Sequence, residues 1–187
     1  KVTSEGGSVI CERAMYGGGR TWAHDSIGVT DSSRTWNLAE GCTQGGMETW
    51  VLVQNPGATD ITVDLTFMTS AGQQAGPQDF PIAAHSRHSF NLSDYVTDWD
   101  VSTKVDATGE VICERAMYGN ARTWAHDSIG VTSPANEWYL AEGCTQGGME
   151  TWVLVQNPGD TQVTVDLTFM TSAGQQAGPQ EFPIAAH

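Results

Sequence analysis

Apolar and polar residues alternate along several short stretches of this sequence, which predicts half-buried β-strands. The alternation is clearest in residues 61–70, ITVDLTFMTS, where one face carries Ile61, Val63, Leu65, Phe67 and Thr69. Six further stretches carry strand patterns: residues 35–41, 47–55, 79–85, 87–96, 100–105 and 110–118. Apolar residues spaced three and four apart, as in amphipathic helices, are rare. We therefore expect an all-β fold.

Turn-forming residues separate the predicted strands. Pro56 and Gly57 end the strand over residues 47–55, and the segment DATG, residues 106–109, is predicted to join two strands by a turn. The Gly- and Gln-rich residues 71–78 are predicted to form a loop. Seven short strands with turns at these intervals are typical of an immunoglobulin-like β-sandwich.

The sequence also contains a long internal repeat. A shift of 102 residues aligns residues 9–85 with residues 111–187 without a gap, and 65 of these 77 positions are identical. A period of about 100 residues matches a whole β-sandwich domain and is too long for a short solenoid repeat. We therefore predict tandem immunoglobulin-like β-sandwich units of about 100 residues.

The differences between the two copies place the boundaries of the predicted units. Residues 31–35 differ throughout from residues 133–137, as expected for a linker. The predicted organisation is the C-terminal part of one unit in residues 1–34, a complete unit in residues 35–133 and the N-terminal part of the next in residues 134–187. Because the first segment supplies late strands and the last supplies early ones, strand exchange between chains is a hypothesis that this organisation raises.

The charge of the chain argues against several classes of partner. Eight basic residues against 22 acidic residues give a formal net charge of −14, and such a surface repels phosphate backbones and anionic lipids. No run approaches the roughly 18 consecutive apolar residues of a membrane-spanning helix. We therefore expect no nucleic-acid partner and no membrane insertion.

The motifs of the repeat resemble those of a known family. They are W-x-L-A-E-G, L-V-Q-N-P-G, a Gly-containing hairpin, P-I-A-A-H-S-R and E-R-A-M-Y, within residues 36–126. Their combination resembles a tandem immunoglobulin-like repeat of uncharacterised function from large secreted and surface-attached bacterial proteins. The resemblance implies an extracellular or cell-surface array without enzymatic activity, acting as a filament, stalk or adhesin whose units associate along a fibre. It carries over no catalytic residues.

The chain has four cysteines, two in each period of the repeat. An even number of cysteines in a secreted β protein favours disulfides. We predict a bond between Cys42 and Cys113 within the complete unit, with Cys11 and Cys144 bonded to neighbouring units. The alternative pairs Cys11 with Cys42 and Cys113 with Cys144, which would staple successive units together, and free thiols are the third hypothesis.

The stretch RTWAHDSIGVT, residues 20–30 and again 122–132, is the most enzyme-like part of the sequence. It places His24 beside Asp25 and Ser26. Adjacent strand residues point to alternate faces, however, whereas the members of a catalytic triad converge from separate elements. We therefore predict no catalytic residues here, but a structural loop whose Trp packs on the next unit.

Aromatic and histidine side chains of the repeat are candidate exposed residues for binding or for a junction between units. They are Tyr16, Trp22, His24, Tyr118, Trp124 and His126. A multivalent surface module that binds glycans is the alternative function, and it requires Tyr16, Trp22 and His24 to be exposed together on one face. Trp36 and Trp50 are expected to fill the sandwich core instead.

Acidic residues gather in the segment SDYVTDWD, residues 93–100, which contains Asp94, Asp98 and Asp100. Oxygen-rich clusters suit Ca²⁺, but the spacing differs from that of an EF-hand loop. We expect a solvated acidic loop and no cofactor, with a calcium site as the alternative.

Overall fold

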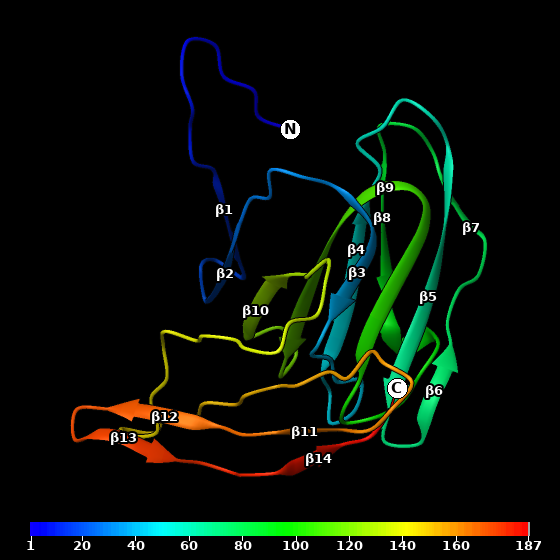
Figure 1. The fold of residues 1–187 in the computed structure, drawn as a ribbon. Coiled ribbons are helices and arrows are strands. Elements are labelled where there is room, and N and C mark those ends of the chain that lie inside the picture. The colour runs from blue at the N-terminus through cyan, green and yellow to red at the C-terminus, as the bar shows by residue number, and fades with distance from the viewer. Residues whose placement is uncertain (187) are drawn as a thin grey trace. The chain divides into compact units, whose positions relative to one another are not determined.

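The computed structural model describes residues 1–186 and shows a protein made of antiparallel β-strands (Figure 1). The predicted all-β class is confirmed. The chain divides into two compact units, Lys1–Trp138 and Tyr139–His187, and each is described by itself. His187, the last residue of the third predicted segment, lies outside the described residues.

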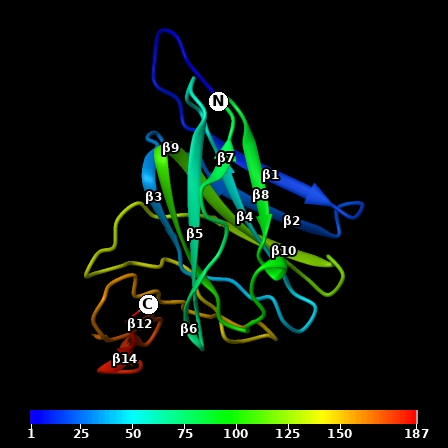
Figure 2. The ribbon, with the colours of Figure 1, turned by 90° about the vertical axis from the view of Figure 1, so that its right-hand side faces the viewer.

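Eight strands of the first unit form one hydrogen-bonded system around the long strand β9 (Figure 1, Figure 2). They are β3 (Ser33–Leu38), β4 (Glu48–Gln54), β5 (Ile61–Thr69), β6 (Gly72–Ala75), β7 (Phe80–Ile82), β8 (Arg87–Asn91), β9 (Ser102–Gly119) and β10 (Trp124–Ile129). The first half of β9 pairs with β3 and β5, and its second half pairs with β4 and β10. Strands β6 and β7 pair with β5, and β8 pairs with β4. The arrangement is consistent with a β-sandwich whose two sheets share β9.

The core of the unit is built by alternation along these strands. Its largest fully buried side chains include Trp36, Phe67, Phe90, Leu65 and Leu92. The alternation predicted for residues 61–70 is confirmed, because every second residue from Ile61 to Phe67 is buried; Thr69 at its end is half-buried. Each such side chain contributes roughly 1.5–3 kcal/mol when it is fully removed from water.

Trp36 fills the core as predicted, whereas the prediction for Trp50 is wrong. The buried face of β4 carries Thr49, Val51 and Val53, so Trp50 lies on the opposite face and is only half-buried. Its indole N–H donates to Glu48 Oε2 at 3.2 Å. The position of a side chain along the strand therefore outweighs its size in deciding where it points.

The predicted turn at residues 106–109 is wrong, because β9 continues through it without interruption. Asp106 and Thr108 accept hydrogen bonds from neighbouring strands. Thr35 Oγ1 donates to Asp106 Oδ1 at 2.9 Å, and the Thr62 N–H donates to Thr108 Oγ1 at 2.9 Å. A Cβ at Gly109 would lie 2.5 Å from Ile61 Cγ2. This glycine permits a close approach of two strands, and β9 passes from one sheet to the other here.

The predicted loop over residues 71–78 contains strand β6, which continues the antiparallel pairing of β5. Three of its four residues are exposed, so no apolar alternation marks the strand. An edge strand of this kind is held by its backbone hydrogen bonds, and side-chain patterning does not reveal it.

No helix among the described residues is long and apolar enough to cross a membrane.

The second unit repeats only part of this arrangement. Its strands are β11 (Val163–Val165), β12 (Thr168–Thr171), β13 (Gly174–Ala177) and β14 (Phe182–Ile184). They form two antiparallel pairs, β11 with β14 and β12 with β13, which match the pairs of β5 with β7 and of β5 with β6. Residues 150–156, the copy of β4, form no strand. Strand β4 pairs with β8 and β9, and residues 139–187 contain no copy of either sequence.

Candidate functional site

Each copy of the repeat contains the same β-hairpin. In the first copy, β1 (Glu12–Gly17) pairs with β2 (Trp22–Ile27), and in the second copy the end of β9 pairs with β10 in the same register. The predicted loops over residues 20–30 and 122–132 are therefore wrong. Polar side chains lie on both faces of this hairpin, so its strands lack the apolar alternation on which the prediction depended.

The turn of each hairpin is built from consecutive residues with positive φ. In the first copy these are Gly18, Gly19 and Arg20, and in the second copy Asn120, Ala121 and Arg122. A Cβ at the preceding residue, Gly17, would overlap the indole ring of Trp22, and the second copy has the same arrangement. The Trp side chain thus covers a glycine on the opposite strand, a pairing that fixes the register of the hairpin.

Ala121 offers a direct test of this turn, since it has a φ of 54° where the first copy has Gly19. A left-handed conformation costs an L-residue roughly 1–2 kcal/mol, and glycine avoids most of that cost. We expect Ala121→Gly to raise the free energy of unfolding by about 1 kcal/mol, measured by urea denaturation. As a control, Ala125→Gly within β10 should lower it, and a stabilisation by both variants would contradict the assignment.

Alternation gives each hairpin two faces of different chemistry. One face, named here the clamp face, carries an Arg, a Met, a Trp and a His: Arg13, Met15, Trp22 and His24 in the first copy, and Arg115, Met117, Trp124 and His126 in the second. The opposite face, named the carboxylate face, carries a Glu, a Tyr and an Asp: Glu12, Tyr16 and Asp25, and Glu114, Tyr118 and Asp127.

In the second copy, the clamp face holds a carboxylate of its own unit. Arg115 Nη2 lies 2.7 Å from Glu40 Oε2, and His126 Nε2 lies 3.6 Å from Glu40 Oε1. The Arg115 side chain is only 6% exposed. Burial lowers the pKa of Arg115, and the Glu40 charge opposes this effect, so the pair stabilises a cation inside the unit. Burial likewise lowers the pKa of His126.

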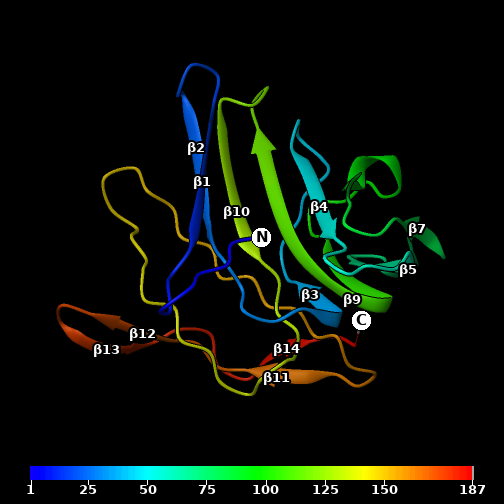
Figure 3. The same cartoon turned by 90° about the horizontal axis from the view of Figure 1, so that it is seen from above.

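In the first copy, the same clamp face holds carboxylates of the other hairpin, where β2 packs beside β10 (Figure 3). The guanidinium of Arg13 donates to Asp127 and, at 3.1 Å, to Glu114 Oε2. His24 Nδ1 lies 3.0 Å from Asp127 Oδ1, and these two side chains are 3% and 1% exposed. Burial lowers the pKa of Arg13, but the Asp127 and Glu114 carboxylates outweigh it and raise this pKa overall.

Aromatic rings complete the contact between the two hairpins. Trp22 stacks on His24 within the clamp face and meets the edge of Tyr118 at a centroid distance of 5.4 Å. The Tyr118 hydroxyl lies 3.4 Å from His24 Nε2. The imidazole of His24 therefore contacts Asp127 with one nitrogen and Tyr118 with the other, which fixes its orientation.

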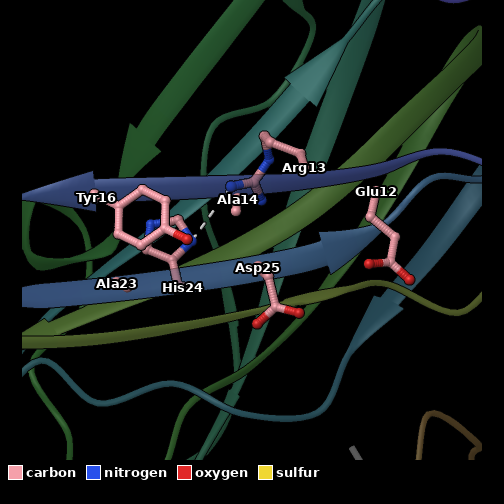
Figure 4. Close-up of a pocket in the computed structure, with 7 residues that line it drawn as sticks. All are labelled: Glu12, Arg13, Ala14, Tyr16, Ala23, His24 and Asp25. Carbon is pink, nitrogen blue, oxygen red and sulfur yellow. Dashed lines mark hydrogen bonds between the residues drawn. The ribbon is translucent and has the colours of Figure 1, made fainter.

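Figure 4 shows the pocket on the first hairpin, in which Arg13 Nη1 lies 3.4 Å from His24 Nδ1. The pocket is lined by Glu12, Arg13, Ala14, Tyr16, Ala23, His24 and Asp25. Tyr16 and Asp25, from the carboxylate face, are exposed.

Among the six predicted binding or junction residues, the structure brings together Trp22, His24 and Tyr118. Trp124 and His126 stack on each other in the second clamp face, whereas Tyr16 is exposed on the carboxylate face of the first hairpin. Glycan binding required Tyr16, Trp22 and His24 on one exposed face. His24 is buried, and Tyr16 lies on the opposite face of the hairpin, so the structure does not meet that condition.

The charged residues of the site were missed by sequence reasoning. They are Arg13, Glu40, Glu114, Arg115 and Asp127. The signal was present in the motif E-R-A-M-Y followed by A-H-D, because a hairpin register places the Arg diagonally across from the His on one face. Recognising that signal required the hairpin, which the sequence pattern did not reveal.

The predicted disulfide between Cys42 and Cys113 is absent, and all four cysteines are free thiols in the structure. Cys113 lies opposite Val53 on β4, whereas the Cys42 N–H bonds to the side chain of Thr49, four residues earlier on that strand. Four strand positions span about 13 Å, while a disulfide requires Cα atoms within about 7 Å. Burial raises the pKa of both buried thiols, Cys42 and Cys113, which disfavours the reactive thiolate.

The acidic segment at residues 93–100 is tied into the fold by Asp98. Its carboxylate accepts hydrogen bonds from the Ser70 hydroxyl at 2.5 Å and from the Ser70 N–H at 3.2 Å, and the hydroxyl contributes most to lowering the pKa of Asp98. Within residues 1–186, no three His, Cys, Asp or Glu side chains gather as a metal site. The segment therefore gives no support to the calcium alternative.

Comparisons with known proteins give no family. No protein-family description and no curated protein matches this chain. Among solved structures, a Thermotoga maritima protein designated 1070 is similar, with a TM-score of 0.49 and 12% identity over 55% of this chain and 96% of that protein. An Anabaena sensory rhodopsin transducer has a TM-score of 0.39 and 20% identity over 47% of this chain and 99% of its own. At these TM-scores neither likeness bears on function.

Proposed function

We propose that this chain is a non-enzymatic structural repeat protein of the extracellular space or cell surface. It forms a filament, stalk or adhesin from near-identical immunoglobulin-like units. The observation that carries the proposal is the contact between the two hairpins, in which one copy of the repeat holds the next through residues that both copies possess. The two hairpins are thereby fixed to each other at a defined place within residues 1–138.

The chemistry of the contact supports a structural role. His24 and Asp127 are the residue types of an acid–base pair, but both side chains are almost completely buried and face each other. A catalytic acid or base must reach a proton on the substrate within about 3 Å. His24 Nδ1 and Asp127 Oδ1 lie 3.0 Å apart, so these side chains are engaged with each other in holding the two hairpins together.

The polarity of the contact supports assembly along one direction. The clamp face of the first hairpin meets the carboxylate face of the second, so the two surfaces in contact are different. Contacts between unlike surfaces can continue from unit to unit, whereas contacts between like surfaces close on themselves. The exposed carboxylate face of the first hairpin, with Glu12, Tyr16 and Asp25, remains open for such a contact.

Asp127 is the residue whose removal tests this contact. We expect Asp127→Ala to speed hydrogen exchange of the amides in β1 and β2 at least tenfold, because Arg13 and His24 lose their buried partner. The core strand β5, which does not touch the contact, should exchange at an unchanged rate. The measurement is hydrogen–deuterium exchange by mass spectrometry on dilute, monomeric protein.

Asp25→Ala supplies the matched control. Asp25 occupies the same position in the first copy and is exposed, so its removal should leave exchange in β1 and β2 within about twofold of the wild type. Equal effects of Asp127→Ala and Asp25→Ala would show that the hairpins are not held together by this contact, and the proposed role of the junction would then be abandoned.

A further inference from the structure

An arginine and a histidine of the second clamp face are in direct contact. Arg115 Nη1 lies 3.0 Å from His126 Nδ1, while Nη2 of the same guanidinium lies 2.7 Å from Glu40 Oε2. The three residues come from different parts of one unit, since Glu40 follows β3, Arg115 lies on β9 and His126 lies on β10. Strand β10 pairs only with β9, so these side chains add a second attachment of β10 to the unit.

The contact with Arg115 determines the protonation state of His126. A guanidinium has only hydrogen-bond donors and stays charged, so the nitrogen that faces it must offer a lone pair. His126 Nδ1 is therefore unprotonated, and the neutral ring carries its proton on Nε2. Nε2 in turn lies 3.6 Å from Glu40 Oε1.

Protonation of His126 would turn this contact from attraction into repulsion. Nδ1 would become a donor, and the imidazolium and the guanidinium would face each other as two cations at 3.0 Å. The Arg115 side chain is almost completely buried, so solvent ions screen the repulsion little. His126 itself is half-buried, so its ring remains within reach of protons from the solvent.

The other charged groups around His126 act in both directions. Burial, which has the largest effect, opposes the cationic form, as do Arg115 and His24 from β2, whereas Glu40 and Asp127 favour it. Overall, the pKa of His126 lies below its ordinary value of 6.5. The folded unit thus binds this proton less readily than the unfolded chain does. The resulting stability is fully present above pH 6.5 and falls as the pH drops below that value.

We propose that His126 makes the clamp of the complete predicted unit an acid-sensitive latch. At neutral pH, Arg115 donates both to the imidazole and to Glu40, and β10 is held against the residues that follow β3. Acidification protonates His126, the imidazolium leaves Arg115, and β10 loosens. The latch goes beyond the proposed function and does not rest on it, because all three residues belong to one unit.

The first copy of the clamp shows how the partner decides the response to acid. There His24 Nδ1 lies 3.4 Å from Arg13 Nη1, but it also lies 3.0 Å from Asp127 Oδ1. A proton on this nitrogen therefore has a carboxylate to accept it. Since His126 Nδ1 faces the guanidinium instead, we assign the acid sensitivity to His126 and not to His24.

Nuclear magnetic resonance of the histidine rings tests the protonation state directly. The ring nitrogen shifts distinguish the two neutral tautomers, and their change with pH gives the pKa of each ring. For His126, identified by its loss in His126→Asn, we expect the Nε2–H tautomer at about pH 7.5 and a titration midpoint below 6.5. An Nδ1–H tautomer, or a midpoint at or above 6.5, would overturn the latch.

Hydrogen exchange tests the loosening of β10. We expect the protection factors of the β10 amides, corrected for the direct effect of pH on exchange, to fall at least about fivefold between about pH 7.5 and about pH 5. In His126→Asn, the side-chain oxygen takes the place of Nδ1 and accepts from Arg115 at both pH values. The fall in this variant should therefore be less than about twofold.

His85→Asn is the matched control for the exchange measurement. His85 is exposed and has a φ of 54°, a conformation that asparagine tolerates, so this variant should keep the full fall in β10 protection. Protection of β10 that is independent of pH in the wild type would overturn the latch, as would an equal fall in the wild type and in His126→Asn. If His126→Asn does not fold, the tautomer and the midpoint measured on the wild type decide the matter.

Discussion

Replacing Trp36 with alanine is expected to lower the free energy of unfolding of the first unit by about 3–5 kcal/mol, the range for removing a large aromatic side chain from a core. Trp36 is 1% exposed, and its indole N–H donates to the Val111 carbonyl at 3.0 Å and to the Ser33 carbonyl at 3.2 Å. The substitution removes the largest side chain of the core together with a link between β3 and β9. Urea denaturation followed by circular dichroism measures the loss.

The copy of this residue, Trp138, supplies the control for that measurement. Trp138 is 57% exposed, so Trp138→Ala should change the free energy of unfolding by less than about 0.5 kcal/mol in dilute protein. If Trp36→Ala leaves the chain unfolded, Trp36→Phe preserves a measurable transition, with a smaller loss expected. Similar losses for Trp36→Ala and Trp138→Ala would contradict the assignment of a folded core to the first copy alone.

The contrast between these two tryptophans shows how far the sequence predicts the fold. Alternation in residues 61–70 predicts the buried face of β5, because a strand in a sandwich buries every second side chain. The same alternation is present in residues 163–172 with nearly the same letters. There the side chains remain largely exposed, since the strand that would cover them is absent from the unit. The alternation of apolar and polar residues predicts which face of a strand is apolar. That face is buried only where other strands of the unit pack around it.

Strand β9 explains why the predicted turn at residues 106–109 is wrong. Glycine and aspartate at residues 106–109 favour a turn in an isolated hairpin. In the folded unit, β3 and β5 pair with β9 at Asp106 and Ala107, and these contacts keep the segment extended. Non-local pairing therefore overrides the local preference for a turn, and local sequence carries no signal of it.

The candidate site was only partly predictable, again because it depends on contacts between segments that are far apart in the sequence. A Trp packing on the next unit was expected, and the structure places Trp22 against Tyr118 of the second hairpin, within the same compact unit. The ion pairs of Arg13 and Arg115 were not expected, because each depends on a carboxylate more than 70 positions away along the chain. The two identical clamp faces bind different carboxylates, so residue identity alone does not fix the partner. What each clamp binds depends on which element lies against it.

Replacing Glu40 with glutamine is expected to destabilise the first unit by about 3–5 kcal/mol, as for a buried ion pair that loses one partner. Glutamine has nearly the same volume, so the loss would come from the charge. Without Glu40, the buried guanidinium of Arg115 has no carboxylate at 2.7 Å to offset the cost of removing it from water. Urea denaturation at neutral pH measures the change in the free energy of unfolding.

Glu142→Gln is the matched control for this prediction, because Glu142 is the exposed copy of Glu40 and should change stability by less than about 0.5 kcal/mol. A double variant separates charge from packing. If the cost is the unpaired cation, Arg115→Met added to Glu40→Gln should recover part of the loss, since an apolar pair of similar volume carries no desolvation penalty. If the double variant is less stable than Glu40→Gln alone, the Arg115 side chain contributes through its packing, and the ion pair is not what stabilises the clamp face within the unit.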